Sequence, residues 1–126
     1  MLSEQFHKVF AGLTRAYGTY TIEDSSNIKI EGTAKTVSES YTSYLWELHL
    51  TGKIGLGVIP INDNNKCKWG CIDVDEYNLN LEELSQKFKK KNIIVCRSKS
   101  GGAHLFIFTK NFISAGLMIK KLKEVC

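Results

Sequence analysis

Apolar positions follow two periods along the chain, and these periods predict a protein with both helices and strands. Helical spacing of apolar residues predicts four helices, at residues 3–16, 40–50, 81–91 and 113–125. Alternating or continuous apolar stretches predict strands at residues 17–22, 28–30, 33–37, 54–60, 66–75, 92–97 and 104–108. The polar residues 62–65 predict a turn that joins strands 54–60 and 66–75 into a hairpin.

The order of these elements predicts the fold class. After residue 53 the order is strand, strand, helix, strand, strand, helix. Such elements bury their apolar faces when helices pack on one face of a mainly antiparallel sheet, so we expect an α+β protein. No repeat or linker divides the sequence, so we expect residues 1–126 to form a single domain. Residues 1–52 would be a small N-terminal α/β segment, and residues 53–126 a ββαββα core.

The composition of the 126 residues is that of a soluble globular protein, with 43% apolar and 24% charged residues. No apolar stretch approaches the ~20 residues of a membrane span, and residues 1–10 lack the apolar core of a signal peptide. We therefore expect a cytoplasmic protein with no membrane partner. Cys71 and Cys96 lie inside apolar stretches, where we expect buried thiols rather than zinc ligands or disulfides.

The net charge of +4 conceals an uneven distribution. Residues 1–85 hold 7 Lys and Arg against 12 Asp and Glu, whereas residues 86–126 hold 10 Lys and Arg and a single acid, Glu124. This separation favours a polyanionic partner together with metal ions over a membrane surface. The alternative for the lysines near the end of helix 81–91 is a solvated helix terminus, where cations suit the helix dipole.

Two carboxylates end an apolar strand at residues 71–76. Side chains on a strand alternate between faces, so Asp73 and Asp75 point the same way, about 7 Å apart. Two like charges on one face repel each other unless a cation lies between them. A divalent metal bound by carboxylate oxygens meets this need, and the alternative is a strand that simply enters an acidic loop.

A second polar stretch, residues 97–104, joins two apolar strands. It combines two cations, two hydroxyls, two glycines and a histidine in eight residues. Glycines let backbone N–H groups approach an anion, and the cations and hydroxyls add further donors, so this stretch could bind phosphate. The alternatives are a basic hairpin turn and, since His104 faces the same side as Phe106 and Phe108, a histidine of the core.

Together the two stretches resemble the archaeo-eukaryotic primase superfamily, the primase-polymerases. The resemblance is strongest to the bacterial and phage branch that includes the TOTE conflict-system primases, and it extends over about residues 44–108. It rests on the helix end at 45–52 (LWELHLTG), the strand at 56–60 (LGVIP), the Asp-x-Asp motif at 73–75 and the Arg-Ser-x-Ser-Gly-x-Ala-His motif at 97–104. The combination is specific, although each motif alone is not.

This resemblance implies template-dependent nucleotidyl transfer by a DNA primase or polymerase, on an RRM-like palm sheet. It implies that Asp73 and Asp75 bind Mg²⁺ or Mn²⁺, and that Ser100 and His104 contact the phosphates of a nucleoside triphosphate. Arg97, Ser98 and Lys99 would lie beside that nucleotide. The implied catalytic residues are Asp73, Asp75 and His104. The implied partners are nucleoside triphosphates, a single-stranded or primed DNA template, and a helicase or other domain of the full-length protein.

The sequence departs from the family pattern in one respect. The family uses a third motif, an acidic residue on a later strand, but only Glu124 follows His104, in a predicted Lys-rich helix. We therefore expect the N-terminal portion of a longer primase-polymerase, or a short relative of one. A non-catalytic nucleotide- or nucleic-acid-binding module and a metal-dependent nuclease remain as alternative functions.

Overall fold

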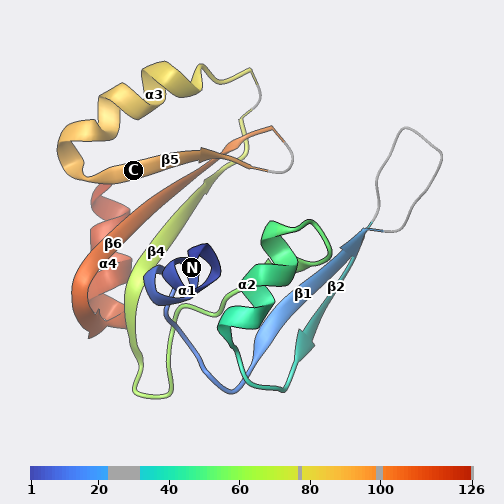
Figure 1. Cartoon of the computed structure of the whole chain (residues 1–126). Coiled ribbons are helices and arrows are strands. Elements are labelled where there is room, and N and C mark those ends of the chain that lie inside the picture. The colour runs from blue at the N-terminus through green and yellow to red at the C-terminus, as the bar shows by residue number, and fades with distance from the viewer. Residues whose placement is uncertain (23–31, 77, 99–100, 126) are drawn as a thin grey trace. The chain divides into compact units, whose positions relative to one another are not determined.

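The computed structural model describes residues 1–22, 32–76, 78–98 and 101–125. This part of the chain is α+β, as predicted, with four α-helices and two antiparallel three-stranded sheets. The chain forms two compact units, Met1–Asn64 and Asn65–Cys126, and each contains one of the sheets (Figure 1). The predicted strand 28–30 lies outside the described residues. None of the helices in the described ranges is long and apolar enough to span a bilayer.

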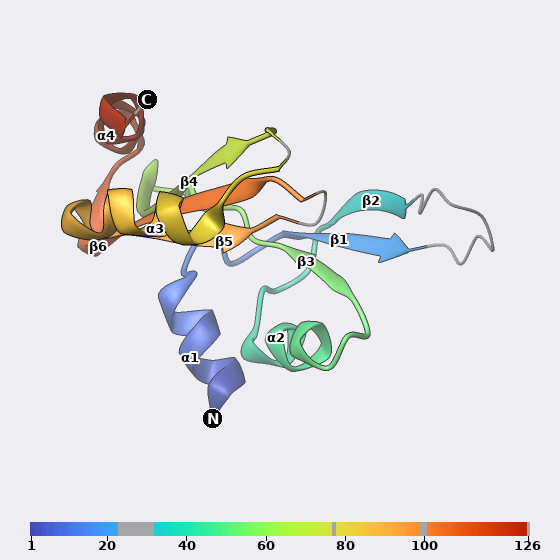
Figure 2. The same cartoon turned by 90° about the horizontal axis from the view of Figure 1, so that it is seen from above.

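The first unit contains a sheet with the strand order β2-β1-β3. Its elements are α1 (Leu2–Val9), β1 (Tyr17–Ile22), β2 (Gly32–Val37), α2 (Ser43–Leu50) and β3 (Gly55–Gly57). Figure 2 shows α1 and α2 on the same side of these strands. The core of this unit consists of the buried side chains of Tyr17, Tyr41, Leu45 and Trp46. The partly buried residues that pack against them come from α1, the strands and the segments beside them: Phe6, Phe10, Val37, Ile54, Leu56 and Val58.

The partner of β3 differs from the prediction. The sequence predicted a hairpin with the strand at 66–75, but β3 pairs with β1, so that hairpin is wrong. Glycine explains the pairing, because a Cβ at Gly55 would lie only 2.8 Å from the Cβ of Tyr20 and 2.9 Å from its carbonyl oxygen. The two backbones can approach this closely only without a side chain at Gly55.

Helix α1 is shorter than the predicted helix 3–16 because the chain after it pairs with another segment. The N–H of Leu13 donates to the carbonyl of Ile59 over 2.8 Å, and Gly12 packs against the same carbonyl. The Tyr41 hydroxyl donates to the Phe10 carbonyl just beyond the helix end. These long-range hydrogen bonds satisfy backbone groups that a longer helix would have paired internally.

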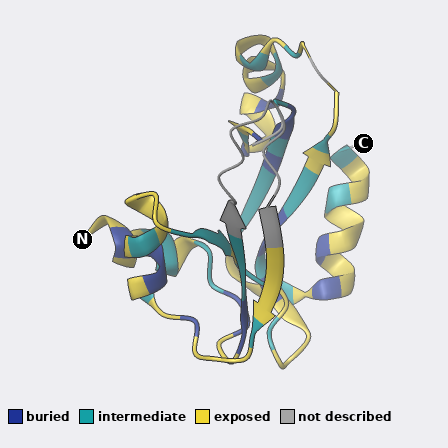
Figure 3. Cartoon of the chain, turned by 90° about the vertical axis from the view of Figure 1, so that its right-hand side faces the viewer, coloured by how far each residue is buried: buried dark blue, intermediate teal, exposed yellow. Residues whose placement is uncertain are grey.

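The second unit holds a sheet with the strand order β4-β6-β5. Its elements are β4 (Lys66–Val74), α3 (Leu81–Phe88), a 3₁₀ turn η1 (Lys89–Lys91), β5 (Ile93–Arg97), β6 (Ala103–Ser114) and α4 (Ala115–Val125). One face of the sheet packs against both helices, around the buried residues Phe88, Ile93 and Leu105. The buried positions of α4 face the strands in Figure 3. The prediction of helices on one face of an antiparallel sheet is thus confirmed for this unit.

Strand β6 is longer than the predicted strand 104–108 and continues to Ser114, so α4 begins at Ala115 instead of residue 113. The reason is that Ile113 and Ser114 pair with Cys67 and Lys66, at the far end of β4. The polar residues 109–111 suggested the end of a strand, yet the pairing resumes beyond them.

Tyr41 gives a prediction about the stability of the first unit. Its hydroxyl donates to the Phe10 carbonyl over 2.9 Å and accepts from the Trp46 indole over 2.7 Å. Tyr41→Phe removes both bonds in a buried setting and should lower the free energy of unfolding by about 1–3 kcal/mol. Chemical denaturation measures the loss. Tyr44→Phe, at a side chain that is 65% exposed, is the control and should leave stability unchanged; equal effects would contradict the role of Tyr41.

Candidate active site

Asp73 and His104 form the centre of the candidate site. They are direct partners in the antiparallel ladder between β4 and β6. His104 Nε2 lies 3.4 Å from Asp73 Oδ1, an ion pair when the imidazole is protonated. The side chains are 38% and 60% exposed, so solvent weakens the attraction and the pair contributes little to stability. Both groups are therefore accessible to a ligand.

Gly102, just before β6, lies against the end of β4. Gly102 packs so closely on the Val74 carbonyl that a Cβ could not be accommodated, and Ser98 Oγ would also lie 3.3 Å from it. The Ser98 N–H donates to the Gly102 carbonyl, and Gly101 has a φ of +95°, which favours glycine. Gly102 thus brings the described end of the second polar stretch beside the end of β4.

Aromatic rings support His104 on the face of the sheet opposite α3 and α4. The imidazole meets the edge of the Phe106 ring at a centroid distance of 5.9 Å, and Phe106 stacks on Phe108 at 6.0 Å. The prediction that these three side chains share a face is confirmed. Because His104 is more than a third exposed, it is not the buried core histidine that the sequence left open as an alternative.

Two cysteines lie beside this pair, and the sequence did not predict their place in the site. Cys96 is the ladder partner of His104 on the other side and is exposed, so the expectation of a buried thiol is wrong for it. It lies on an edge strand, on the face that α3 and α4 leave uncovered. Cys71 is partly buried, and this burial, followed by the charges of Asp73 and Cys96, raises its pKa to about 11.

The remaining predicted residues are placed as follows. Asp75 is exposed and directly follows β4, Arg97 is exposed at the end of β5, and Ser98 is buried in the turn. Lys99 and Ser100 lie outside the described residues. Within the described ranges, no group of three or more His, Cys, Asp or Glu side chains could hold a metal ion. Two exposed carboxylates are nevertheless a fitting donor set for Mg²⁺, which is commonly held by one or two carboxylates plus substrate phosphates and water.

Comparison with known families identifies the family of the chain. Residues 5–125 match the family described as TOTE conflict system, Archaeo-Eukaryotic Primase domain. The match covers nearly the whole chain, so the protein belongs to this archaeo-eukaryotic primase family. Members typically use divalent metals, and the family implies nucleotide and DNA substrates in general. A search of curated proteins gives no match.

Gly102 gives a prediction about the geometry of the turn. Gly102→Ala forces a Cβ into the Val74 carbonyl and should lower the free energy of unfolding by about 1–3 kcal/mol through overpacking. Gly116→Ala in α4 is the matched control, because a Cβ there meets nothing within 4 Å. That change should be neutral, or stabilising by up to about 1 kcal/mol. Thermal denaturation of both variants measures the contrast, and equal effects would contradict the close approach.

The two cysteines beside His104 should differ in reactivity. At pH 8 the raised pKa and partial burial of Cys71 leave little thiolate, so iodoacetamide should label Cys96 about tenfold faster or more. Asp73→Asn should accelerate labelling of Cys71, since the carboxylate contributes to its raised pKa. Peptide mass spectrometry follows each thiol separately. Equal rates in the wild-type protein would show that the environments of the two thiols are not as described.

Proposed function

We propose that the protein is the nucleotidyl-transfer domain of a primase-polymerase, which joins nucleoside triphosphates on a DNA template with Mg²⁺ or Mn²⁺. The observation that carries the proposal is the pairing of Asp73 with His104 across β4 and β6, at an accessible position. Carboxylates suit a divalent cation, and an imidazolium suits a phosphate. A triphosphate with its metal ion needs both kinds of group side by side.

Some residues of the site would bind the metal cation, and others would bind the anionic triphosphate. Asp73 and Asp75 would hold the metal, which supplies Lewis-acid stabilisation of phosphate oxygens when bound. His104 would donate a hydrogen bond to the triphosphate. Arg97 stays a candidate from the sequence alone, because it alternates with Cys96 along β5 and so lies on the other face of the strand. The 3′-hydroxyl would lose its proton to solvent as its oxygen forms a bond to the α-phosphorus, and pyrophosphate would leave as its bond to that phosphorus breaks. The protein's contribution is mainly positioning and electrostatic stabilisation. Lys99 and Ser100 remain candidates for phosphate binding from the sequence alone.

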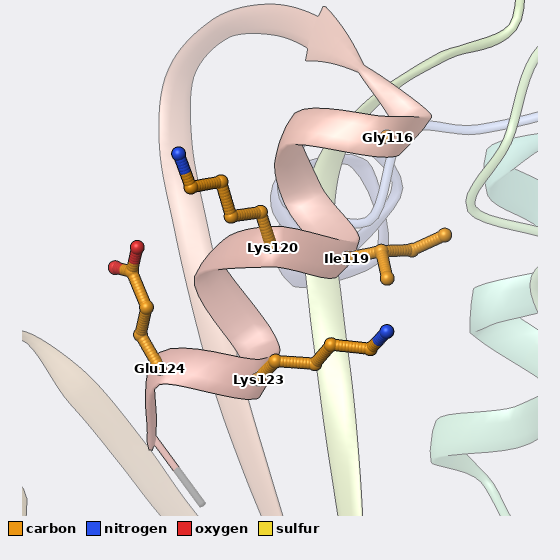
Figure 4. Close-up of a pocket in the computed structure, with 5 residues that line it drawn as sticks. All are labelled: Gly116, Ile119, Lys120, Lys123 and Glu124. Carbon is orange, nitrogen blue, oxygen red and sulfur yellow. The ribbon is translucent and has the colours of Figure 1, made fainter.

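Glu124 does not fit the place of a third metal-binding carboxylate. It lies on α4 beside Lys120 and Lys123, where these side chains line a shallow hollow on the surface of the helix (Figure 4). Helix α4 packs over Gly70, on the face that also buries Ile72 and Val74. Asp73 alternates with these residues along β4 and so points to the opposite face.

The position of Glu124 favours a second candidate function, a nucleotide-binding module without catalysis. Within the described ranges no three-ligand group exists, and binding of a metal–nucleotide complex needs fewer protein ligands than transfer does. Both candidates predict nucleotide binding at Asp73 and His104, and they differ only in turnover. Incorporation of labelled nucleotide into a primed template therefore distinguishes them.

Calorimetric titration with dATP and ATP, with and without Mn²⁺, tests the site. We expect binding that requires Mn²⁺ and weakens about tenfold or more in Asp73→Asn and in His104→Ala, since each loses a charge-assisted contact. Glu82→Gln removes an exposed carboxylate from the first turn of α3 and should bind as the wild type does. Undiminished binding by Asp73→Asn would refute the metal role of this carboxylate.

A further inference from the structure

Strand β6 contains a bulge opposite Lys68. The ladder pairs Trp69 with Phe108 and Cys67 with Ile113, so one residue of β4 faces the four residues 109–112 of β6. The extra residues must leave the plane of the sheet. The Thr109 hydroxyl holds them in shape, because it lies 3.1 Å from the Lys68 carbonyl and 2.8 Å from the Asn111 carbonyl. The bulge is therefore a defined structure anchored to β4.

The bulge presents an aromatic ring together with lysines. Phe112 is 40% exposed, and Lys68 Nζ lies 5.4 Å from the centre of its ring, within cation–π range. Lys110 is exposed in the same bulge. The bulge therefore combines an accessible aromatic ring with two cations, Lys68 and Lys110.

The sequence around the bulge is free of negative charge. Residues 65–72 and 101–123 contain six lysines and no Asp or Glu. The whole second unit, residues 65–126, holds 12 Lys and Arg against 6 Asp and Glu, whereas residues 1–64 hold 5 against 7. The surface of the bulge is thus suited to a polyanion.

We propose that the bulge binds single-stranded nucleic acid, with a base stacked on Phe112 and phosphates contacted by Lys68 and Lys110. Aromatic rings flanked by cations bind single strands in this way, because unpaired bases offer their faces for stacking. A base inside a duplex is already stacked on both sides, so a duplex cannot use the ring. The proposal rests on the proposed function only in taking the bound strand to be the template.

The bulge lies apart from the candidate active site on the same pair of strands. Asp73 and Lys68 are separated by five residues along β4, which corresponds to about 17 Å at the rise of a strand. Lys68 also alternates with Asp73 along β4, so it points to the face on which α4 packs, whereas His104, Phe106 and Phe108 lie on the other face. A strand held at the bulge therefore leaves Asp73 and His104 free for a nucleotide.

Fluorescence anisotropy of a labelled oligothymidine, without metal or nucleotide, tests the proposal on the whole chain. Phe112→Leu keeps an apolar side chain but removes the ring, and should raise the Kd about fivefold or more, whereas Phe112→Tyr should retain binding. Lys68→Ala with Lys110→Ala should also weaken binding. It should lower the slope of log K against log salt by about 1.4, the value for two lost phosphate contacts on a single strand. Lys89→Ala with Lys90→Ala, in η1, is the charge-matched control and should leave both quantities nearly unchanged.

The outcomes separate this proposal from the proposed function. Equal binding by Phe112→Leu and the wild type would overturn it, as would equal losses in the two lysine pairs. Tighter binding of a duplex than of oligothymidine would also overturn it. Oligouridine should bind comparably, since stacking does not require a deoxyribose. Asp73→Asn should bind the strand as the wild type does. A negative result for metal-dependent nucleotide binding would therefore leave the strand-binding proposal standing, and a negative result for strand binding would leave the proposed nucleotide site standing.

Discussion

The antiparallel ladder between β4 and β6 is the constraint on which the second unit depends. It places Asp73 opposite His104 and joins the two polar stretches that lie some 25 residues apart in sequence. The same ladder directs Ile72, Val74 and Leu105 into the core under the helices. Because side chains alternate along a strand, one pairing register decides which side chains face the core and which face the site. A shift of the register by one residue would turn the core residues to the site face and the site residues to the core. The fold and the chemistry of this unit are therefore specified together.

Some elements could be predicted because their signals are local. Helix α3 begins where expected since Asn80 accepts a hydrogen bond from the Glu83 N–H, and such a cap is visible in a few adjacent residues. The partner of β3 and the end of α1 could not be predicted in this way. Both depend on contacts with distant segments, β1 for the strand and Ile59 for the chain after the helix. Periodicity indicates which residues are apolar but not which strand they will join.

The candidate site was predictable in its residues more than in its surroundings. Residue type and spacing were sufficient to select Asp73 and His104, which the structure places side by side. The close approach of Gly102 is to the Val74 carbonyl, whereas the sequence suggested an approach to an anion. Cys96 was assigned to the core because its neighbours are apolar, but β5 alternates and its even-numbered positions face away from the helices. The bulge was missed because polar residues within a long strand resemble its end.

The bulge in β6 also affects how this protein could vary in length. An insertion between His104 and Phe108 would rotate one of these side chains to the other face and separate it from its partner. Residues 109–112 are outside the ladder, so one of them could be gained or lost while Asp73 and His104 keep their register. Relatives of this protein should therefore tolerate insertions and deletions at this point of the strand and resist them only a few residues earlier.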